Sequence, residues 1–315
     1  MTEPSGPPQG NPRRWWIVGA GALAVVVAAG TVAWSLSDFD REARPTPAAA
    51  VTTTPTSTPA PTRKPLPAVP ERPSDEALGA LPLAFHDAVI GQLLDGSQVD
   101  ARNRWTTATP ALPLVPLYAA PDAGAAPIAT LSSSVTTLDT PAATAVWGRS
   151  AGRDGGMVLV STPSRNRTPG DGGVAEAPSA TFAWARAADF SFAAVDRVVR
   201  IDNQASTIAI VRRDGTTETS ETARLGTPDD PTPADTKTYM EANYVDPQVP
   251  YTQGHPISLT GAHSSKLSGY GGNAALTALH FYPDPTGSSH GCVRITAAMT
   301  DALATLPIGT PIEFS

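Results

Sequence analysis

The chain has 315 residues, of which 33 are proline, 26 are glycine and one is cysteine, and its formal net charge is −7. At roughly 100–200 residues per domain, this length predicts two domains plus connecting sequence. The acidic balance lacks the basic stripe of nucleic-acid-binding proteins, so we expect no nucleic-acid partner. A single cysteine excludes an intrachain disulfide framework and a four-cysteine zinc site.

An uncharged apolar segment lies near the N-terminus, at residues 15–34. At about 1.5 Å per residue, a helix of this length spans about 30 Å, the thickness of a bilayer core. Tryptophans lie at both of its ends, and Arg13 and Arg14 precede it. This pattern predicts a single-pass membrane anchor with residues 1–14 in the cytoplasm and the rest outside. A cleaved secretory signal, ending near residues 28–30, is the alternative, and it also places the rest across the membrane.

Two connecting segments follow the apolar one. Residues 35–75 are rich in proline and threonine. Because proline fixes φ and removes a backbone donor, we expect an extended stalk there. Residues 76–111 have apolar side chains near helical spacing, interrupted by Pro82. They predict a lead-in that is partly helical.

Residues 112–192 change to short β-forming runs separated by turn residues. Five such runs predict a small β-barrel-like domain. This segment resembles the bacterial Src-homology-type β-barrels of cell-wall proteins, and two interpretations stay open: a structural spacer and a wall-binding module. The runs are Leu114–Tyr118, Ile128–Leu131, Ala145–Trp147, Met157–Val160 and Phe182–Arg186.

Residues 195–315 form a second β-rich segment. Val199 alternates with Ile201, Ile208 alternates with Ile210, and Asp214-Gly215 is a hairpin signal. Residues 296–306 have apolar side chains at helical spacing, and residues 311–314 predict a closing strand. The fold class that we expect is therefore mainly β with short helices.

The only thiol of the chain, Cys292, lies in the motif Ser-His-Gly-Cys-Val-Arg at 289–294. A lone exposed thiol in an oxidising space is a liability unless the protein uses it. A thiolate is the attacking species in acyl transfer, and a neighbouring imidazole commonly generates it. His290 is two residues away, and His280 ends an apolar run that predicts a buried strand. An imidazolium so placed is expected to lower the pKa of the thiol.

Two further residues of the motif suit acyl transfer. Gly291 has no side chain, so a substrate carbonyl can approach the amides of Gly291 and Cys292, which could hold an oxyanion. Arg294 lies two residues beyond Cys292, on the same face of a strand. Its guanidinium would suit a substrate carboxylate.

The motif, together with the upstream Leu279-His280, resembles the catalytic signature of the L,D-transpeptidases. The resemblance covers about residues 195–315 and includes the strand pair at 198–211, the segment at 227–240 and the closing strand. It implies a β-sandwich in which Cys292 is the acylated nucleophile and His280 is the base. It also implies that His290 lines the site and that Arg294 contacts substrate.

The same resemblance implies a reaction on peptidoglycan. Cys292 would attack the stem tetrapeptide, release the terminal D-alanine and pass the acyl group to a neighbouring stem, which links two third residues. Carbapenems would acylate the same sulfur, and no metal or organic cofactor is needed. Ser289, Tyr270 and His263 are further candidates for substrate contact.

Several alternatives stay open. His263 is a second candidate for the base. Only eight residues, 281–288, separate His280 from Ser289; this interval is shorter than is usual in the family and concerns the loop that covers the substrate. An L,D-carboxypeptidase with water as acceptor would use the same residues. A catalytically silent wall-binding protein and a metal site built from His280, His290 and Cys292 are the other two alternatives.

Overall fold

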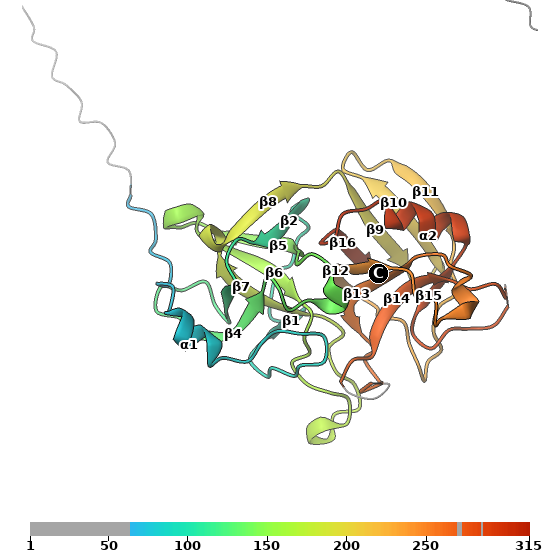
Figure 1. Cartoon of the computed structure of the whole chain (residues 1–315), viewed down its shortest axis with the longest axis horizontal. Helices are drawn as coiled ribbons and strands as arrows, with labels where there is room; N and C mark the ends of the chain where they lie inside the picture. The colour runs from blue at the N-terminus through green and yellow to red at the C-terminus, as the bar shows by residue number, and fades with distance from the viewer. Residues whose placement is uncertain (1–63, 270–272, 285) are drawn as a thin grey trace, which may run out of the picture. The chain divides into compact units, whose positions relative to one another are not determined.

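The computed structural model of the protein describes residues 64–269, 273–284 and 286–315. The predicted cytoplasmic segment, the anchor, most of the stalk and Tyr270 lie outside these ranges. Within them, no helix combines the length and apolar character needed to cross a bilayer. The described chain is mainly β, as predicted: it forms two sheets, one built from β1–β8 and the other from β9–β16, with few short helices (Figure 1).

The first sheet is nearly closed and barrel-like, with the strand order β4-β3-β7-β6-β5-β2-β8 and with β1 paired to β7. All five predicted runs lie in its strands, because the turn residues between them end each strand where expected. The strands are β1 (Leu94–Asp95), β2 (Thr106–Pro110), β3 (Leu114–Tyr118), β4 (Pro127–Ser132), β5 (Thr144–Ser150), β6 (Met157–Thr162), β7 (Thr181–Arg186) and β8 (Phe190–Ala194).

The lead-in is helical over one short stretch only. Only α1 (Asp75–Gly79) is helical, and the hydroxyl of Ser74 caps it by accepting a hydrogen bond from the amide of Ala77. Pro82 follows, where the missing N–H cannot continue a helix, and its carbonyl accepts from the amide of Thr130 instead. Strand β2 then joins the first sheet, so the end of this segment belongs to the barrel-like sheet.

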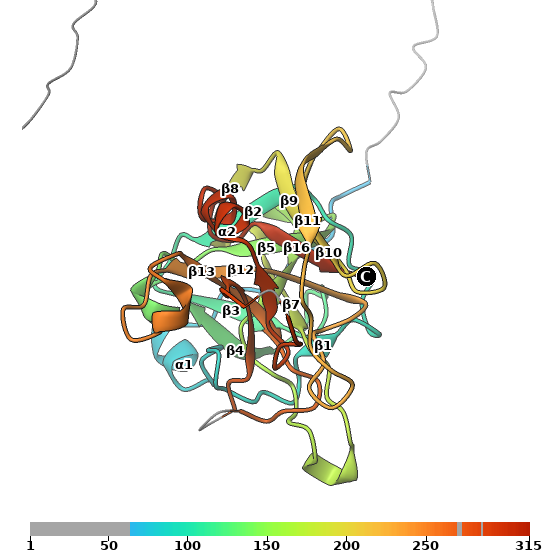
Figure 2. The same ribbon diagram turned by 90° about the vertical axis from the view of Figure 1, so that its right-hand side faces the viewer.

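The second sheet has the order β11-β10-β9-β16-β12-β13-β14-β15. The predicted alternation, hairpin and closing strand are all found in it. Helix α2 (Ala297–Ala304) begins after Thr296, whose hydroxyl caps it, and packs against β11, β13 and β14 (Figure 2). The strands are β9 (Arg197–Asp202), β10 (Thr207–Arg212), β11 (Thr217–Thr222), β12 (Thr236–Tyr244), β13 (Ile257–His263), β14 (Leu276–Phe281), β15 (Val293–Ile295) and β16 (Pro311–Phe314).

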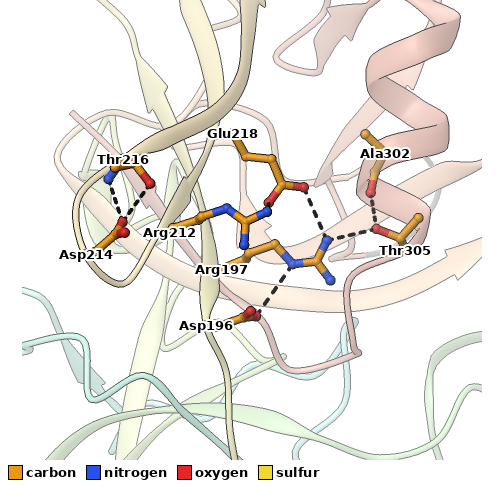
Figure 3. A network of polar contacts seen from close by, with 8 residues as sticks. All are labelled: Asp196, Arg197, Arg212, Asp214, Thr216, Glu218, Ala302 and Thr305. Carbon is orange, nitrogen blue, oxygen red and sulfur yellow. Dashed lines mark hydrogen bonds and ion pairs between the residues drawn. The ribbon is translucent and has the colours of Figure 1, made fainter. Parts of the chain in front are cut away.

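A polar network fastens the β9–β11 hairpins to the end of α2 (Figure 3). Glu218 forms ion pairs with Arg212 at 2.6 Å and with Arg197 at 3.6 Å. Arg197 also donates to the hydroxyl of Thr305, which follows α2. Each of these partly exposed ion pairs contributes little to the free energy of unfolding. The main effect of the network is therefore to orient the hairpin.

The two sheets share an apolar contact. Tyr239 of β12 packs in one cluster with Trp147 and Phe182 of the first sheet. The ring of Tyr239 needs the glycine at position 261, because a Cβ there would come within 2.3 Å of the ring. The β12–β13 pair is thus shaped to let the first sheet approach closely.

A buried polar seam runs beside this contact. The ring of His263 donates from Nε2 to the carbonyl of His86 over 2.9 Å, and His86 Nδ1 bonds the hydroxyl of Thr137 at 3.0 Å. That hydroxyl donates to Oε1 of Glu241. Burial raises the pKa of Glu241 from 4.5 to about 8 and lowers that of His263 from 6.5 to about 3.

The seam predicts that stability decreases above neutral pH. Because the folded state favours the protonated carboxyl of Glu241, its contribution is complete below pH 4.5 and is lost as the pH rises toward 8. His263 acts the other way and loses its contribution only below pH 6.5. At about 1.4 kcal/mol per pH unit, the free energy of unfolding should fall by about 2 kcal/mol between pH 6.5 and 8.

The variant Glu241→Gln should remove this decrease, because an amide does not titrate. Urea unfolding of both proteins at pH 6.5 and pH 8 measures it. An equal decrease in the variant would contradict the assignment to Glu241.

Candidate functional site

His280 lies on β14, which pairs antiparallel with β13 and parallel with β15. The ring is buried, with 6% of its surface exposed. Its Nδ1 lies 2.9 Å from the carbonyl oxygen of Phe281. Because a carbonyl only accepts, Nδ1 carries the proton, and the neutral ring presents Nε2 as the acceptor.

Cys292 comes directly before β15, and the residue is partly exposed. The register pairs His280 with Arg294 and Leu279 with Val293. One step back along the same register, Cys292 lies beside Ala278, whose backbone hydrogen bonds the thiol. Side chains at alternate positions of a strand share a face. The structure thus brings Cys292, His280 and Arg294 together on one face of neighbouring strands.

The protonation states differ from the expected thiolate and imidazolium. Burial raises the pKa of Cys292 above its ordinary 9.0, although the Ala278 backbone and the charge of Arg294 oppose this. Burial also lowers the pKa of His280 below 6.5. At neutral pH the pair therefore rests as a thiol and a neutral imidazole, because the buried site disfavours both charges. A neutral imidazole has the protonation state that a general base needs.

Three tyrosines that the sequence analysis missed surround this pair. Tyr251, in a short 3-10 helix (Pro250–Thr252), has its ring 5.5 Å from that of His280 and 5.3 Å from that of Tyr282. Burial is the main cause that raises the pKa of Tyr244 and of Tyr251, and the charge of a Cys292 thiolate adds to it. Both phenols are therefore close enough to Cys292 for the charge of a thiolate to act on their pKa.

Arg294 stacks on Tyr282, with its guanidinium carbon 3.9 Å from the ring centroid. Its Nε is buried and has no hydrogen-bond partner within the described residues. Arg224 lies 5.5 Å from the same ring and donates to the carbonyls of Tyr282, at 3.1 Å, and Thr286, at 2.6 Å. Arg224 thus supports the short interval between His280 and Ser289, and it leaves Arg294 with an unused donor.

The turn before Cys292 is held from inside. Gly291 has φ +87°, a left-handed conformation that favours glycine, and a Cβ there would come within 3.1 Å of the carbonyl oxygen of Pro231. The buried Ser289 donates its hydroxyl to the carbonyl of Cys292, and its amide donates to Leu225. Ser289 therefore shapes the turn, and its hydroxyl is not presented to a substrate.

The other predicted site residues lie elsewhere. The exposed ring of His290 bonds the carboxylate of Asp230 through Nδ1 at 2.8 Å. His263 is completely buried in the seam between the sheets, so it is not accessible as a base or to a substrate. The remaining candidate, Tyr270, lies outside the described residues. In the described ranges, no group of three or more His, Cys, Asp or Glu side chains is arranged to hold a metal ion.

The missed residues come from three separate loops and strand ends. Tyr282 is two residues after His280. Its proximity to His280 could therefore have been predicted from the sequence. Arg224 and Tyr251 are far from the motif in sequence. Arg224 comes near the site because its backbone pairs with that of Arg294. The sequence has no pattern that predicts this pairing.

One part of the chain, which includes the candidate site, matches a known protein family. Residues 196–314 match the model described as YkuD: L,D-transpeptidase catalytic domain, which confirms the predicted resemblance for that part of the chain. Comparison with curated proteins gives no match.

Three solved structures are similar over part of the chain. Bdellovibrio bacteriovorus Bd1075 is 20% identical with a TM-score of 0.30, over 38% of this chain and 47% of that one. A mutant of the Enterococcus faecium L,D-transpeptidase is 18% identical with a TM-score of 0.28, over 38% and 50%. An L,D-transpeptidase from Mycobacterium smegmatis is 14% identical with a TM-score of 0.29, over 50% and 90%. The chain spans about half the length of the first two. The segment that matches the L,D-transpeptidase catalytic domain contains Cys292, His280 and Arg294.

Proposed function

We propose that residues 196–314 catalyse L,D-transpeptidation of peptidoglycan stem peptides, with Cys292 as nucleophile and His280 as base. The observation that carries the proposal is the pair of facing strands β14 and β15. Their register supports the proposal. His280, a buried imidazole whose Nδ1 is committed to a backbone carbonyl, pairs with Arg294, and the partly exposed residue Cys292 lies two positions before Arg294. A fixed tautomer with a free Nε2 is what proton abstraction from the thiol needs.

In the first half-reaction, His280 takes the thiol proton as the sulfur attacks the carbonyl between the third and fourth residues of a tetrapeptide stem. The amides of Gly291 and Cys292 are the proposed donors to the developing oxyanion. The C–N bond then breaks, and the imidazolium returns its proton to the departing amine of D-alanine. A thioester between Cys292 and the third residue remains.

In the second half-reaction, a side-chain amine of another stem attacks the thioester. His280 accepts the amine proton and returns it to the sulfur, which regenerates the thiol and links two third residues. Water in place of the amine would give an L,D-carboxypeptidase. His280 would act as the base for either acceptor. Whether an amine or water attacks the thioester therefore decides between the two activities. A catalytically silent wall-binding protein is the third candidate, and it predicts an unreactive thiol.

Arg294 is the proposed contact for a substrate carboxylate. Its stacking on Tyr282 orients the guanidinium, and its buried Nε has an unused donor. Lysine keeps the charge but neither stacks as a plane nor offers a bidentate fork. We therefore expect Arg294→Lys to raise the half-saturating concentration of the tetrapeptide by about tenfold with a smaller effect on kcat. Steady-state kinetics of D-alanine release measure both, and an unchanged half-saturating concentration would contradict this role.

The experiment that tests the function combines a substrate and an inhibitor. The protein is incubated with a purified tetrapeptide stem, and D-alanine and cross-linked dimers are quantified. A parallel sample is exposed to a carbapenem, and its intact mass is measured. Dimers and a Cys292 adduct support the transpeptidase; D-alanine without dimers supports the carboxypeptidase. The absence of both products and of the adduct would refute the enzymatic proposal.

We also propose that residues 15–34 anchor the protein in the cell membrane and that residues 35–75 carry the folded part into the cell-wall space. The charge pattern around the apolar segment supports this orientation. Protease accessibility of the folded part in intact protoplasts tests it, since a cytoplasmic location would leave that part protected.

A further inference from the structure

The segment between β13 and β14 leads directly into the strand that carries His280. It begins at Ser264, after the last residue of β13, and ends at Ala275. Its described part consists of residues 264–269 and 273–275. Wherever this segment lies, it sets the point at which β14 enters the sheet, and hence the position of the imidazole along the strand.

One side chain of the first sheet holds this segment. Arg165 follows β6, and its backbone is fixed by hydrogen bonds with Ala88 and Ile90. Its side chain is completely buried. The guanidinium donates to three carbonyls of the segment, those of Asn273 at 2.9 Å, Ser264 at 3.1 Å and Leu267 at 2.6 Å.

The burial of this guanidinium is costly. Burial lowers the pKa of Arg165 from 12.5 to about 10, so the group is still charged at neutral pH, and no carboxylate contributes to the shift. An apolar side chain of similar volume would fill the same space without the cost of desolvating a charge. What a guanidinium adds is a rigid, planar fork that fixes several acceptors relative to one another.

The segment also reaches the other side of the motif. Lys266 donates from Nζ to the carbonyl of Pro228 over 2.6 Å and lies 3.5 Å from the carboxylate of Glu176. Pro228 belongs to the turn whose Asp230 bonds His290. A cavity of about 570 Å³ adjoins Lys266 and Pro228. Because this cavity adjoins the β13–β14 segment at Lys266, packing alone does not fix the position of the segment there. Directed hydrogen bonds are therefore needed to fix it.

We propose that Arg165 is a positioning residue for acyl transfer, through which the first sheet sets the β13–β14 segment and thereby the strand that carries His280. The inference rests on the proposed function. It makes the first sheet a part of the catalytic apparatus even though it places no group at the reacting atoms. A displacement of about 1 Å at a reacting group can slow a reaction by one or two orders of magnitude.

The experiment compares the full chain with Arg165→Met, Arg165→Lys and the control Arg186→Met. Arg186 is a largely buried arginine of the same sheet that pairs with Asp189 and does not contact the segment. For each protein, intact mass against time and carbapenem concentration gives the first-order acylation constant and the half-saturating concentration. A thermal melt measures stability separately.

Arg165→Met should lower the first-order constant by about tenfold in the folded protein, with less change in the half-saturating concentration. Arg165→Lys should recover part of the rate, because an ammonium can reach some of the carbonyls. The control Arg186→Met should be less stable than the wild type but should have the same first-order acylation constant. Wild-type rates in folded Arg165→Met would overturn the proposal; where that variant does not fold, an unchanged constant in Arg165→Lys would overturn it. An unreactive wild-type protein would instead refute the proposed function.

Discussion

Replacing Cys292 with serine is expected to lower the rates of carbapenem acylation and of D-alanine release by about 10⁴-fold or more. The thiol of Cys292 has a pKa above 9.0, but the hydroxyl of serine is a far weaker acid. In the proposed mechanism the neutral imidazole of His280 deprotonates the thiol during attack, and an imidazole is much less effective with an aliphatic alcohol. Intact mass after carbapenem exposure and chromatography of released D-alanine measure the two rates.

A matched control distinguishes lost chemistry from a disturbed turn. Ser288 is exposed in the same turn, so Ser288→Ala should retain both rates. Thermal unfolding of the Cys292→Ser variant should resemble that of the wild type, because the two side chains are similar in size and the residue is partly exposed. A carbapenem adduct that forms on this variant at the wild-type rate would place the acylated group elsewhere.

The strands could be predicted because local rules and tertiary packing agree in them. Pro311–Phe314 and Leu114–Tyr118 have the same bounds in prediction and structure, and in both cases turn residues limit a short apolar run. The lead-in is less helical than its apolar spacing indicates, because its apolar residues belong to different local structures. Leu78 is buried in the short helix α1, whereas Leu93 is buried directly before β1, so no single helix connects them.

The site was predictable only where sequence neighbours become spatial neighbours. Cys292 and Arg294 are two residues apart on one strand, and His280 joins them because β14 and β15 are adjacent and parallel. His263 has the same chemistry as His280, but its partner is the carbonyl of His86, 177 positions away. The contact between the two sheets buries His263 in the seam, whereas the register of β14 and β15 puts His280 opposite Arg294.

The direction of the pKa shifts was not predictable for the same reason. A histidine near a cysteine in sequence suggests an imidazolium that acidifies the thiol. In the folded chain, desolvation by burial is the largest cause of both shifts: it raises the pKa of Cys292 and lowers that of His280. In the proposed mechanism, the charge separation therefore arises during the reaction and not before it.

Replacing His280 with glutamine is expected to slow acylation by about 10²- to 10⁴-fold at pH 7. The glutamine amide can still donate to the carbonyl of Phe281, so the strand should keep its position, but it cannot accept the thiol proton. His255→Gln is the control, because His255 is a partly exposed histidine that packs against Phe281 and pairs with Asp301. It should leave the rate unchanged.

The pH dependence identifies the role of His280. Burial holds its pKa below 6.5, so the wild-type enzyme should keep its rate down to that pH and lose it only as the imidazole is protonated at lower pH. Without the base, only the spontaneously formed thiolate of Cys292 reacts. Since the pKa of that thiol is raised above 9.0, the rate of His280→Gln should rise about tenfold per pH unit from pH 6 to 9. The ratio of wild-type to variant rates should therefore shrink steadily with rising pH. A ratio that is constant over this range would mean that His280 supports the strand and does not take the proton.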